Sequence, residues 1–185
     1  MRAICDYCGK EVDVLLYQAK DTYKVKGEDI TIDVTICKCS CCGEDIWVSD
    51  VDNNNLRTAY NEYRKKHQLL TPDQIKGIRE KYGLSQVSFA KLLGFGEKTI
   101  ARYENGSIQD EAHNNLMMLV DEPQNLKKLY DRKKYCIPMM EQFSVNARMY
   151  TNAQNIAYSR GKPSYQIRLS SSEKTEQYDD MEVYA

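Results

Sequence analysis

Six of the seven cysteines lie within the first 42 residues, and four of them form two short repeats. Cys5 and Cys8 belong to one Cys-x-x-Cys-Gly sequence, and Cys39 and Cys42 belong to another. Cysteines separated by two residues can turn both sulfurs to one side of a tight turn, and the following glycine lets backbone N–H groups approach the thiolates. Two such turns supply four sulfurs in a tetrahedron, which suits Zn²⁺. We therefore predict that these four cysteines bind one zinc ion per chain.

Four thiolates leave no open position on the metal for a substrate, so the predicted zinc site is structural rather than catalytic. Cys37 and Cys41 lie near the second pair, and a ligand set that includes one of them stays open. We prefer Cys39 and Cys42 because they repeat the spacing of the first pair. An iron–sulfur centre is the alternative cofactor, since four thiolates also suit iron. Disulfides or free thiols are the remaining alternatives.

Charge is distributed unevenly along the chain, although the net charge is only −1. Residues 1–50 carry six Lys and Arg against ten Asp and Glu, whereas residues 51–70 carry four against two. The first part is therefore acidic and the connector after it is basic. A basic connector beside a DNA-reading module would add phosphate contacts, and an ordinary solvated helix face fits the same charges.

The amino terminus, Met-Arg-Ala-Ile-Cys, lacks the apolar region of a signal peptide, and no apolar run approaches the ~20 residues of a membrane span. We expect a cytoplasmic protein with no membrane partner, in which thiols stay reduced and a cysteine cluster indicates a metal site. The sequence also has no phosphate-cradling glycine loop, nucleophile elbow or distinctive pair of carboxylates. We therefore expect a protein that is not an enzyme.

The residues between the two cysteine pairs show the pattern of strands. Apolar residues alternate on both sides of a turn signal at Lys26-Gly27: Val12, Val14, Leu16, Tyr23 and Val25 before it, and Ile30, Ile32, Val34 and Ile36 after it. We therefore expect residues 1–52 to form a small β domain that resembles a zinc ribbon.

Helical spacing begins at residue 53. Residues 53–70 are predicted as a basic helical linker, followed by short helices over about 72–82, 86–93, 97–105, 110–120 and 121–134. Thr71 and Gln74 form a capping box at the start of this series, and Ser85 caps the second of these helices. Glycines 83, 94 and 106 are placed to end helices. Residues 71–134 are therefore predicted as an all-α domain.

Short helices joined by glycine turns are typical of a helix-turn-helix, whose second helix enters the DNA major groove. By position, the recognition helix is 97–105. Its outward residues are predicted to reach bases or phosphates: Lys98, Thr99 and Arg102. Gln86, in the first turn of the preceding helix, is predicted to meet a phosphate. Tyr103 is the last candidate DNA contact, with packing against the scaffold as its alternative. A helical bundle that binds no nucleic acid is the alternative for the whole stretch.

Two segments resemble the Cro/C1 (Xre) repressor family: LSQVSFAKLLG at 84–94 and TIARYENG at 99–106. Together with the amino-terminal Cys-x-x-Cys-Gly pair, this order is similar to the MqsA (YgiT-type) antitoxins over roughly residues 1–130. The resemblance implies a structural zinc domain that engages a toxin, and a homodimeric DNA-binding domain that represses its own operon at a palindrome. In that family an Asn and an Arg of the recognition helix read bases. The Arg maps onto Arg102, whereas Lys98 replaces the Asn, so we expect a different operator sequence.

Residues 135–185 extend beyond that resemblance. A stripe of Met and aromatic residues predicts an amphipathic helix from about Pro138 to Ser159. A strand is predicted around 165–169, followed by an acidic, disordered end from Glu173. Cys136 is interpreted as a small buried hydrophobe.

The predicted fold is therefore an α+β multidomain chain: a β zinc-ribbon-like domain, an all-α Cro/C1-type helix-turn-helix bundle and a carboxy-terminal extension. The predicted function is that of an MqsA-like type II antitoxin and autorepressor that binds a palindromic operator and neutralises a cognate toxin. One alternative is a prophage or mobile-element regulator without a toxin. Another is a zinc-dependent protein–protein adaptor.

Overall fold

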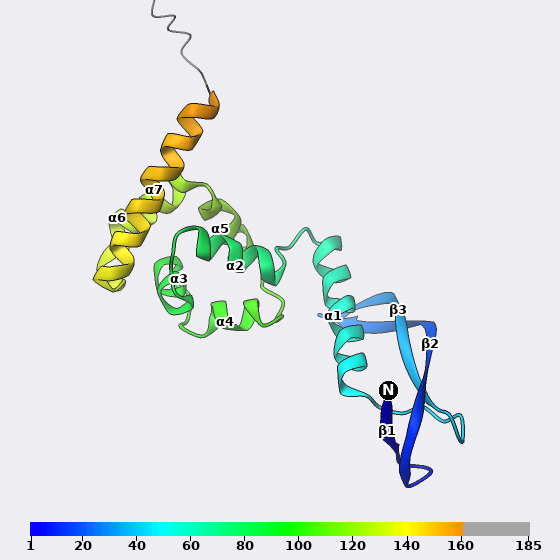
Figure 1. The fold of residues 1–185 in the computed structure, drawn as a ribbon. Helices are drawn as coiled ribbons and strands as arrows, with labels where there is room; N and C mark the ends of the chain where they lie inside the picture. Colours follow the sequence, from blue (N-terminus) through cyan, green and yellow to red (C-terminus); the bar gives the residue numbers. More distant parts are fainter. Residues whose placement is uncertain (161–185) are drawn as a thin grey trace, which may run out of the picture.

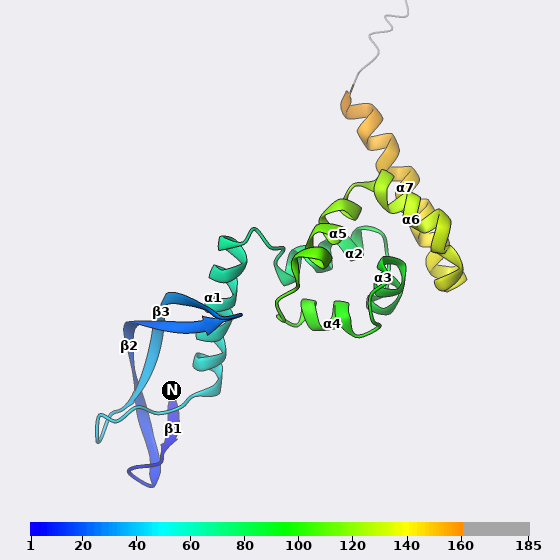
Figure 2. The same ribbon diagram turned by 180° about the vertical axis from the view of Figure 1, so that it is seen from behind.

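A three-stranded antiparallel sheet opens the chain and is followed by seven α-helices, as the computed structural model describes them over residues 1–160 (Figure 1). The strands are β1 (Arg2–Cys5), β2 (Lys10–Val25) and β3 (Glu28–Cys39), in the order β1-β2-β3. Helix α1 (Ser49–Lys66) lies beside the sheet, and the later helices gather into a separate bundle (Figures 1 and 2). The expected combination of a β zinc-ribbon-like part and a helical bundle is confirmed.

The long hairpin β2–β3 brings the two cysteine pairs together. Its two-residue turn has positive φ at both positions, 49° at Lys26 and 89° at Gly27, which matches the right-handed twist of the strands. From this turn the register runs without interruption from Val25 opposite Glu28 to Val14 opposite Cys39. On the other edge of β2, β1 pairs up to Cys5. The predicted turn is confirmed, and its register places Cys5 and Cys39 at the same end of the sheet.

Strand β3 buries its even-numbered residues at one end of the sheet and its odd-numbered residues at the other. Near the turn, β3 buries the predicted residues Ile30, Ile32 and Val34 against α1. Towards the cysteines, it buries Cys37 and Cys39 in a second cluster. On β2 the predicted alternation stops at Leu16, which is 58% exposed. The sequence pattern missed this change because the partners that cover each end come from distant segments.

Helix α1 begins four residues earlier than predicted and ends at Lys66 rather than residue 70. The Asp52 carboxylate accepts a hydrogen bond from the Val48 backbone N–H at 3.1 Å, which fixes the start of the helix. Ala59 and Tyr63 pack into the cluster under the sheet. The Asn55 side chain donates to the carbonyl of Thr35 and accepts from its N–H, as a neighbouring strand would. The predicted linker helix therefore completes the amino-terminal core.

The helices of the bundle begin and end close to the predicted capping residues and glycines. It contains α2 (Pro72–Lys81), α3 (Gln86–Leu93), α4 (Thr99–Glu104), α5 (Glu111–Asp121) and α6 (Pro123–Lys133). The capping box of Thr71 and Gln74 is present, and the Ser85 hydroxyl accepts from the Ser88 N–H at the start of α3. Glycines 83, 94 and 106 have positive φ and follow α2, α3 and α4. Helix α4 is shorter than the predicted 97–105 because residues 96–98 form the preceding turn.

The extension continues as a helical hairpin. A short 3₁₀ turn, η1 (Lys134–Cys136), leads from α6 into α7 (Met139–Arg160), which confirms that a helix lies where one was predicted. The predicted apolar stripe is wrong in its described part, because Met140 and Phe143 are exposed and Val145 is the buried residue. Val145 of α7 is fully buried in the same core as α2 to α6. The predicted strand around 165–169 and the acidic end lie outside the described residues.

A buried ion pair connects three helices of the bundle. The guanidinium of Arg79 on α2 donates to the Glu104 carboxylate on α4 at 2.6 and 3.0 Å, and these side chains are only 12% and 6% exposed. Gln86 of α3 donates to the same carboxylate at 2.7 Å. Burial alone would raise the pKa of Glu104, but these hydrogen bonds outweigh it and hold the pKa below the ordinary 4.5.

Glu104→Gln should destabilise the bundle by about 3–5 kcal/mol, because it removes the buried counter-charge of Arg79 and leaves only the more distant, exposed Glu80 carboxylate at 3.4 Å. Because the folded-state pKa of Glu104 is lowered, its contribution is complete above pH 4.5 and is lost as the pH falls through the folded value. Urea denaturation of the variant should therefore show a weaker acid dependence below pH 4.5. The control is Glu62→Gln, which removes an exposed pair with Lys65 and should cost less than about 1 kcal/mol. Equal effects of the two substitutions would contradict this role for the ion pair.

Candidate metal centre and nucleic-acid interface

The four predicted cysteines meet in one cluster. The Sγ atoms of Cys5, Cys8, Cys39 and Cys42 all lie within 4.8 Å of one another. The Sγ atoms of Cys5 and Cys42 are 3.6 Å apart, and those of Cys8 and Cys39 are 3.7 Å apart. A tetrahedron with zinc–sulfur bonds of about 2.3 Å has sulfur–sulfur edges of about 3.8 Å. The cluster could therefore hold one zinc ion with little rearrangement.

The backbone around each pair is folded as the Cys-x-x-Cys-Gly spacing predicts. The N–H of Gly9 donates to the Cys5 carbonyl at 2.8 Å, and the N–H of Gly43 donates to the Cys39 carbonyl at 2.9 Å. Both glycines have positive φ, 65° and 76°. In the second turn the N–H groups of residues 41 and 42 donate to the Cys39 sulfur at 3.3 and 3.5 Å. Such N–H groups stabilise a thiolate ligand.

Electrostatics of the sulfurs also favour a cation. The N–H groups of Cys42 and Cys41 lower the pKa of Cys39 to about 6, although burial opposes this effect. The pKa of Cys8 is raised to about 12, first by its hydrogen bond with Cys42 and then by burial. One sulfur of the cluster therefore ionises easily while a neighbour resists ionisation. A divalent cation would supply the charge that lets all four sulfurs act as thiolates.

Cys37 and Cys41 have other surroundings. Cys37 is buried on β3 in the core beside the cluster, and burial raises the pKa of its thiol. Cys41 is exposed in the second turn and contributes its backbone N–H to Cys39. The spacing alone left both cysteines open as ligands, and neither belongs to the four-sulfur group.

Helix α4 divides its side chains between the core and the surface. Ile100 is fully buried and Tyr103 is 8% exposed, so both face the bundle. Lys98 and Arg102 are exposed, and Thr99 is half-buried. The connection from α3 to α4 spans residues 94–98, and a short turn between two packed helices is typical of a helix-turn-helix. Three of the predicted DNA contacts therefore lie on the outer side of this element.

Two other candidate DNA contacts are engaged within the fold. The Gln86 amide is half-buried and donates to Glu104, so its side chain positions α3 against α4. The Tyr103 hydroxyl lies 2.7 Å from Nδ1 of His113. The centroid of the His113 ring lies 3.8 Å from that of the Phe95 ring. Tyr103 therefore packs against the scaffold, which was the alternative to a DNA contact. The sequence could not reveal either partner because both lie on other helices.

A family model for the antitoxin component of bacterial toxin–antitoxin systems, MqsA, matches residues 1–129. The chain belongs to the MqsA antitoxin family. That family comprises antitoxins rather than a class of enzymes, and its match spans both the cysteine cluster and the helix-turn-helix. No curated protein matches the chain. Among the helices of residues 1–160, none is both long enough and apolar enough to cross a membrane.

In this member of the MqsA family, the amino-terminal part contacts the segment that follows α4. Arg64 on α1 is 2% exposed and donates to the carbonyls of Gly106 at 2.7 Å and Ser107 at 3.3 Å. Lys26, in the hairpin turn, donates to the Gln109 carbonyl at 3.2 Å. Ile108 packs against the core under the sheet. The chain after α4 is therefore held by α1 and the hairpin.

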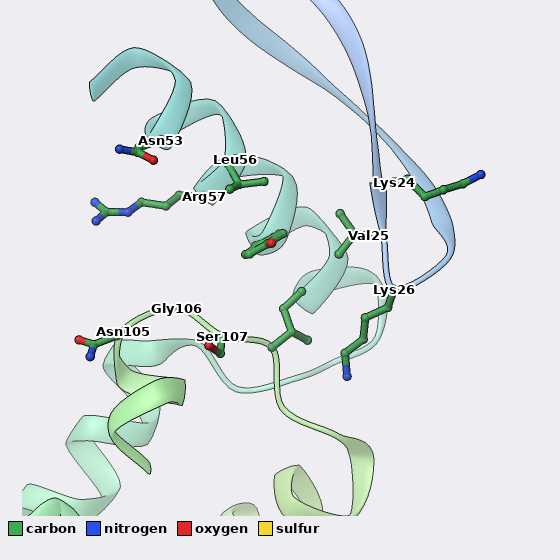
Figure 3. A pocket seen from close by; sticks show the side chains of 11 residues that line it. Lys24, Val25, Lys26, Asn53, Leu56, Arg57, Asn105, Gly106 and Ser107 are labelled. Carbon is green, nitrogen blue, oxygen red and sulfur yellow. The ribbon is translucent and has the colours of Figure 1, made fainter. Parts of the chain in front are cut away.

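Beside this contact lies a cavity of about 560 Å³ between α1, the hairpin and the loop after α4 (Figure 3). Lys26 and Arg57 bring positive charge to its lining, and Asn105 and Gly106 form its wall on the α4 side. Figure 3 shows the Arg57 side chain extending over the cavity on the same side as Asn105, whereas the Lys24 side chain points away from the cavity. Arg57 of α1 and the end of α4 therefore border the same cavity.

The amino-terminal part also exposes large apolar side chains. Trp47 is 76% exposed, and neighbouring positions on β2 are exposed as well: Leu15, Leu16 and Tyr17. Ile4 and Tyr7, beside the cysteine cluster, are similarly exposed. We call these six residues the apolar surface of the zinc domain. Leu15 and Tyr17 share one face of β2 and Leu16 lies on the other, so the exposed apolar residues occupy both sides of the strand. Exposed apolar side chains of this size are typical of protein-binding surfaces.

Cys42→Ser should remove one of the four ligands, reduce zinc from one equivalent to a substoichiometric amount and unfold the amino-terminal domain, because structural zinc supplies folding energy. Metal analysis and circular dichroism of the purified full chain measure both effects. Cys41→Ser is the matched control at the adjacent position and should retain one zinc. Loss of zinc from Cys41→Ser but not from Cys42→Ser would contradict the ligand assignment.

Proposed function

We propose that this protein is an antitoxin and transcriptional autorepressor that binds a palindromic operator as a homodimer and neutralises a cognate toxin through its zinc domain. The observation that carries the DNA-binding half is the outer side of α4, where Lys98 and Arg102 are exposed while Ile100 and Tyr103 anchor the helix. Membership of the MqsA family supports the antitoxin half. Both roles are binding functions and need no catalytic group.

Arg102 and Lys98 carry the proposed base readout. A guanidinium can donate to O6 and N7 of guanine together, and an ammonium can reach guanine or a phosphate. Thr99 begins α4 and can contact a thymine methyl or a phosphate. Two such helices in a homodimer would enter successive major grooves about 34 Å apart. Because Lys98 replaces an asparagine of the family, the proposed operator differs in sequence from the family's.

The phosphate contacts come from both sides of α4. The first turn of α3, which begins at Gln86, points backbone N–H groups outward, where they favour an anion. On the other side, Arg57 borders the cavity that ends at Asn105. Its charge suits a sugar–phosphate backbone that runs past the end of the recognition helix.

The proposed toxin-binding face is the apolar surface of the zinc domain. Residues 1–50 have an excess of four acidic groups over basic ones, so this surface sits in a negative field. Such a field repels DNA and attracts a basic protein. Apolar side chains within it, Trp47 above all, would supply the buried anchors of a protein–protein interface.

Arg102→Ala should weaken binding of the zinc-loaded chain to DNA from upstream of its own gene by about 1–3 kcal/mol, with little change for an unrelated duplex. Arg57→Ala should instead weaken both duplexes alike and make the salt dependence shallower, because it removes a phosphate contact. Fluorescence anisotropy at several fixed salt concentrations measures both. Unchanged operator affinity of Arg102→Ala would reject the recognition helix.

Trp47→Ala should reduce capture of the protein encoded by the adjacent gene about tenfold or more, since exposed aromatic anchors dominate such interfaces. The two products are co-expressed, purified through a tag on the partner and quantified by mass spectrometry. Operator binding by the same variant should stay at the wild-type level, which controls for folding. Operator binding by a wild-type chain that captures no adjacent product would point to a regulator without a toxin.

A further inference from the structure

Helix α7 lies across the turn that leads into the helix-turn-helix. Arg148 donates to the Glu80 carbonyl near the end of α2. A Cβ at Gly83, in the turn, would lie 3.0 Å from Nε of Arg148 and 3.2 Å from Cβ of Ser144. Val145, between these residues, is fully buried in the core. The first half of α7 is therefore packed directly against the α2–α3 turn.

One side chain of α7 reaches the beginning of α3. The Glu141 carboxylate accepts a hydrogen bond from the backbone N–H of Ser85 at 3.1 Å. Ser85 is the N-cap of α3, an eight-residue helix whose first turn contains no acidic side chain. The free N–H groups and the helix dipole make such an end favourable for an anion. In this structure the anion is a carboxylate of the same chain.

The same helix end is the position that the proposed function gives to an operator phosphate. A phosphate and a carboxylate are both anions that accept hydrogen bonds from backbone N–H groups, so they compete for one site. We propose that the first half of α7 is an intramolecular competitor of operator DNA, with Glu141 occupying the phosphate position at the start of α3. This inference rests on the proposed DNA-binding function.

The position of α7 in the chain and its anchoring fit this role. The family match ends at residue 129, so α7 is an addition to the part shared with the family. Its first turns expose much apolar surface, since Met139, Met140 and Phe143 are each more than 60% exposed. Over residues 139–149, Val145 and the half-buried Met149 are its apolar anchors, and Gln142 and Asn146 hydrogen-bond to η1 and to Tyr130 of α6. Few buried apolar contacts therefore hold this part of α7 on the α2–α3 turn, and local opening of such a segment costs less than global unfolding.

Glu141→Gln in the full zinc-loaded chain should tighten binding to the upstream duplex about two- to fivefold at low salt, the worth of one anion at a helix N-terminus. Glu122→Gln is the matched control, because it removes the same charge from an exposed residue between α5 and α6. Arg148→Ala is a second test, in which loss of the charge and release of α7 are expected to change the DNA affinity in opposite directions. Loss of a positive charge by itself weakens DNA binding, whereas release of α7 should strengthen it.

Dissociation constants of the four proteins are compared at one salt concentration, with thermal melting to check folding. Tighter binding by Glu141→Gln than by Glu122→Gln, together with tighter binding by Arg148→Ala, supports the competition. Equal affinities of the two Glu→Gln variants, or weaker binding by Arg148→Ala, would overturn it. If neither the wild type nor Glu141→Gln distinguishes the upstream duplex from an unrelated one, the proposed DNA-binding function itself fails.

Discussion

The carboxylate of Glu104 is the constraint on which the proposed DNA-reading unit depends. It is almost fully buried, and it is satisfied only when Arg79 of α2 and Gln86 of α3 both donate to it. A buried charge without partners is costly, so this arrangement fixes the position of α4 against the two preceding helices. The same contacts therefore also set the positions of the exposed residues of α4. Lys98 and Arg102 can face a groove because Glu104, two residues beyond Arg102, is held on the inner side.

The cysteine cluster, near the amino terminus, would also concentrate charge, because ionisation of its sulfurs places negative charges close together. Four sulfurs within 4.8 Å of one another cannot all ionise without a cation, and backbone N–H groups lower the pKa of Cys39 but do not outweigh the opposing influences on Cys42. A zinc ion would therefore join β1 to the end of β3 where the apolar core is small, at Val12 and Ile46. Small domains of this kind depend on metal because their buried apolar surface is insufficient.

Local features of the fold could be predicted from the sequence, and long-range ones could not. The capping box at Thr71 and the hairpin turn at Gly27 depend on neighbouring residues, and the structure contains both. The meeting of the two cysteine pairs is a long-range exception, since metal chemistry predicts it from the repeated spacing. The burial of Cys37 depends on Ile46 and β1, and the docking of α1 depends on Asn55 reaching the edge of β3. Likewise, the sequence alone indicates that Gln86 is a polar surface residue, because its partner, Glu104, lies on α4.

These long-range contacts give the unit formed by α3 and α4 two neighbours from outside it. On one side, Arg64 of the zinc domain holds the chain just after α4 through the Gly106 carbonyl. On the other, Glu141 of the extension holds the start of α3. One contact is at the end of α4 and the other is at the start of α3. Each links the proposed DNA-binding unit to a part of the chain for which another role is proposed. A partner that displaces α1 or α7 would therefore change the DNA-reading surface through these two hydrogen-bonded ends, without touching Arg102 itself.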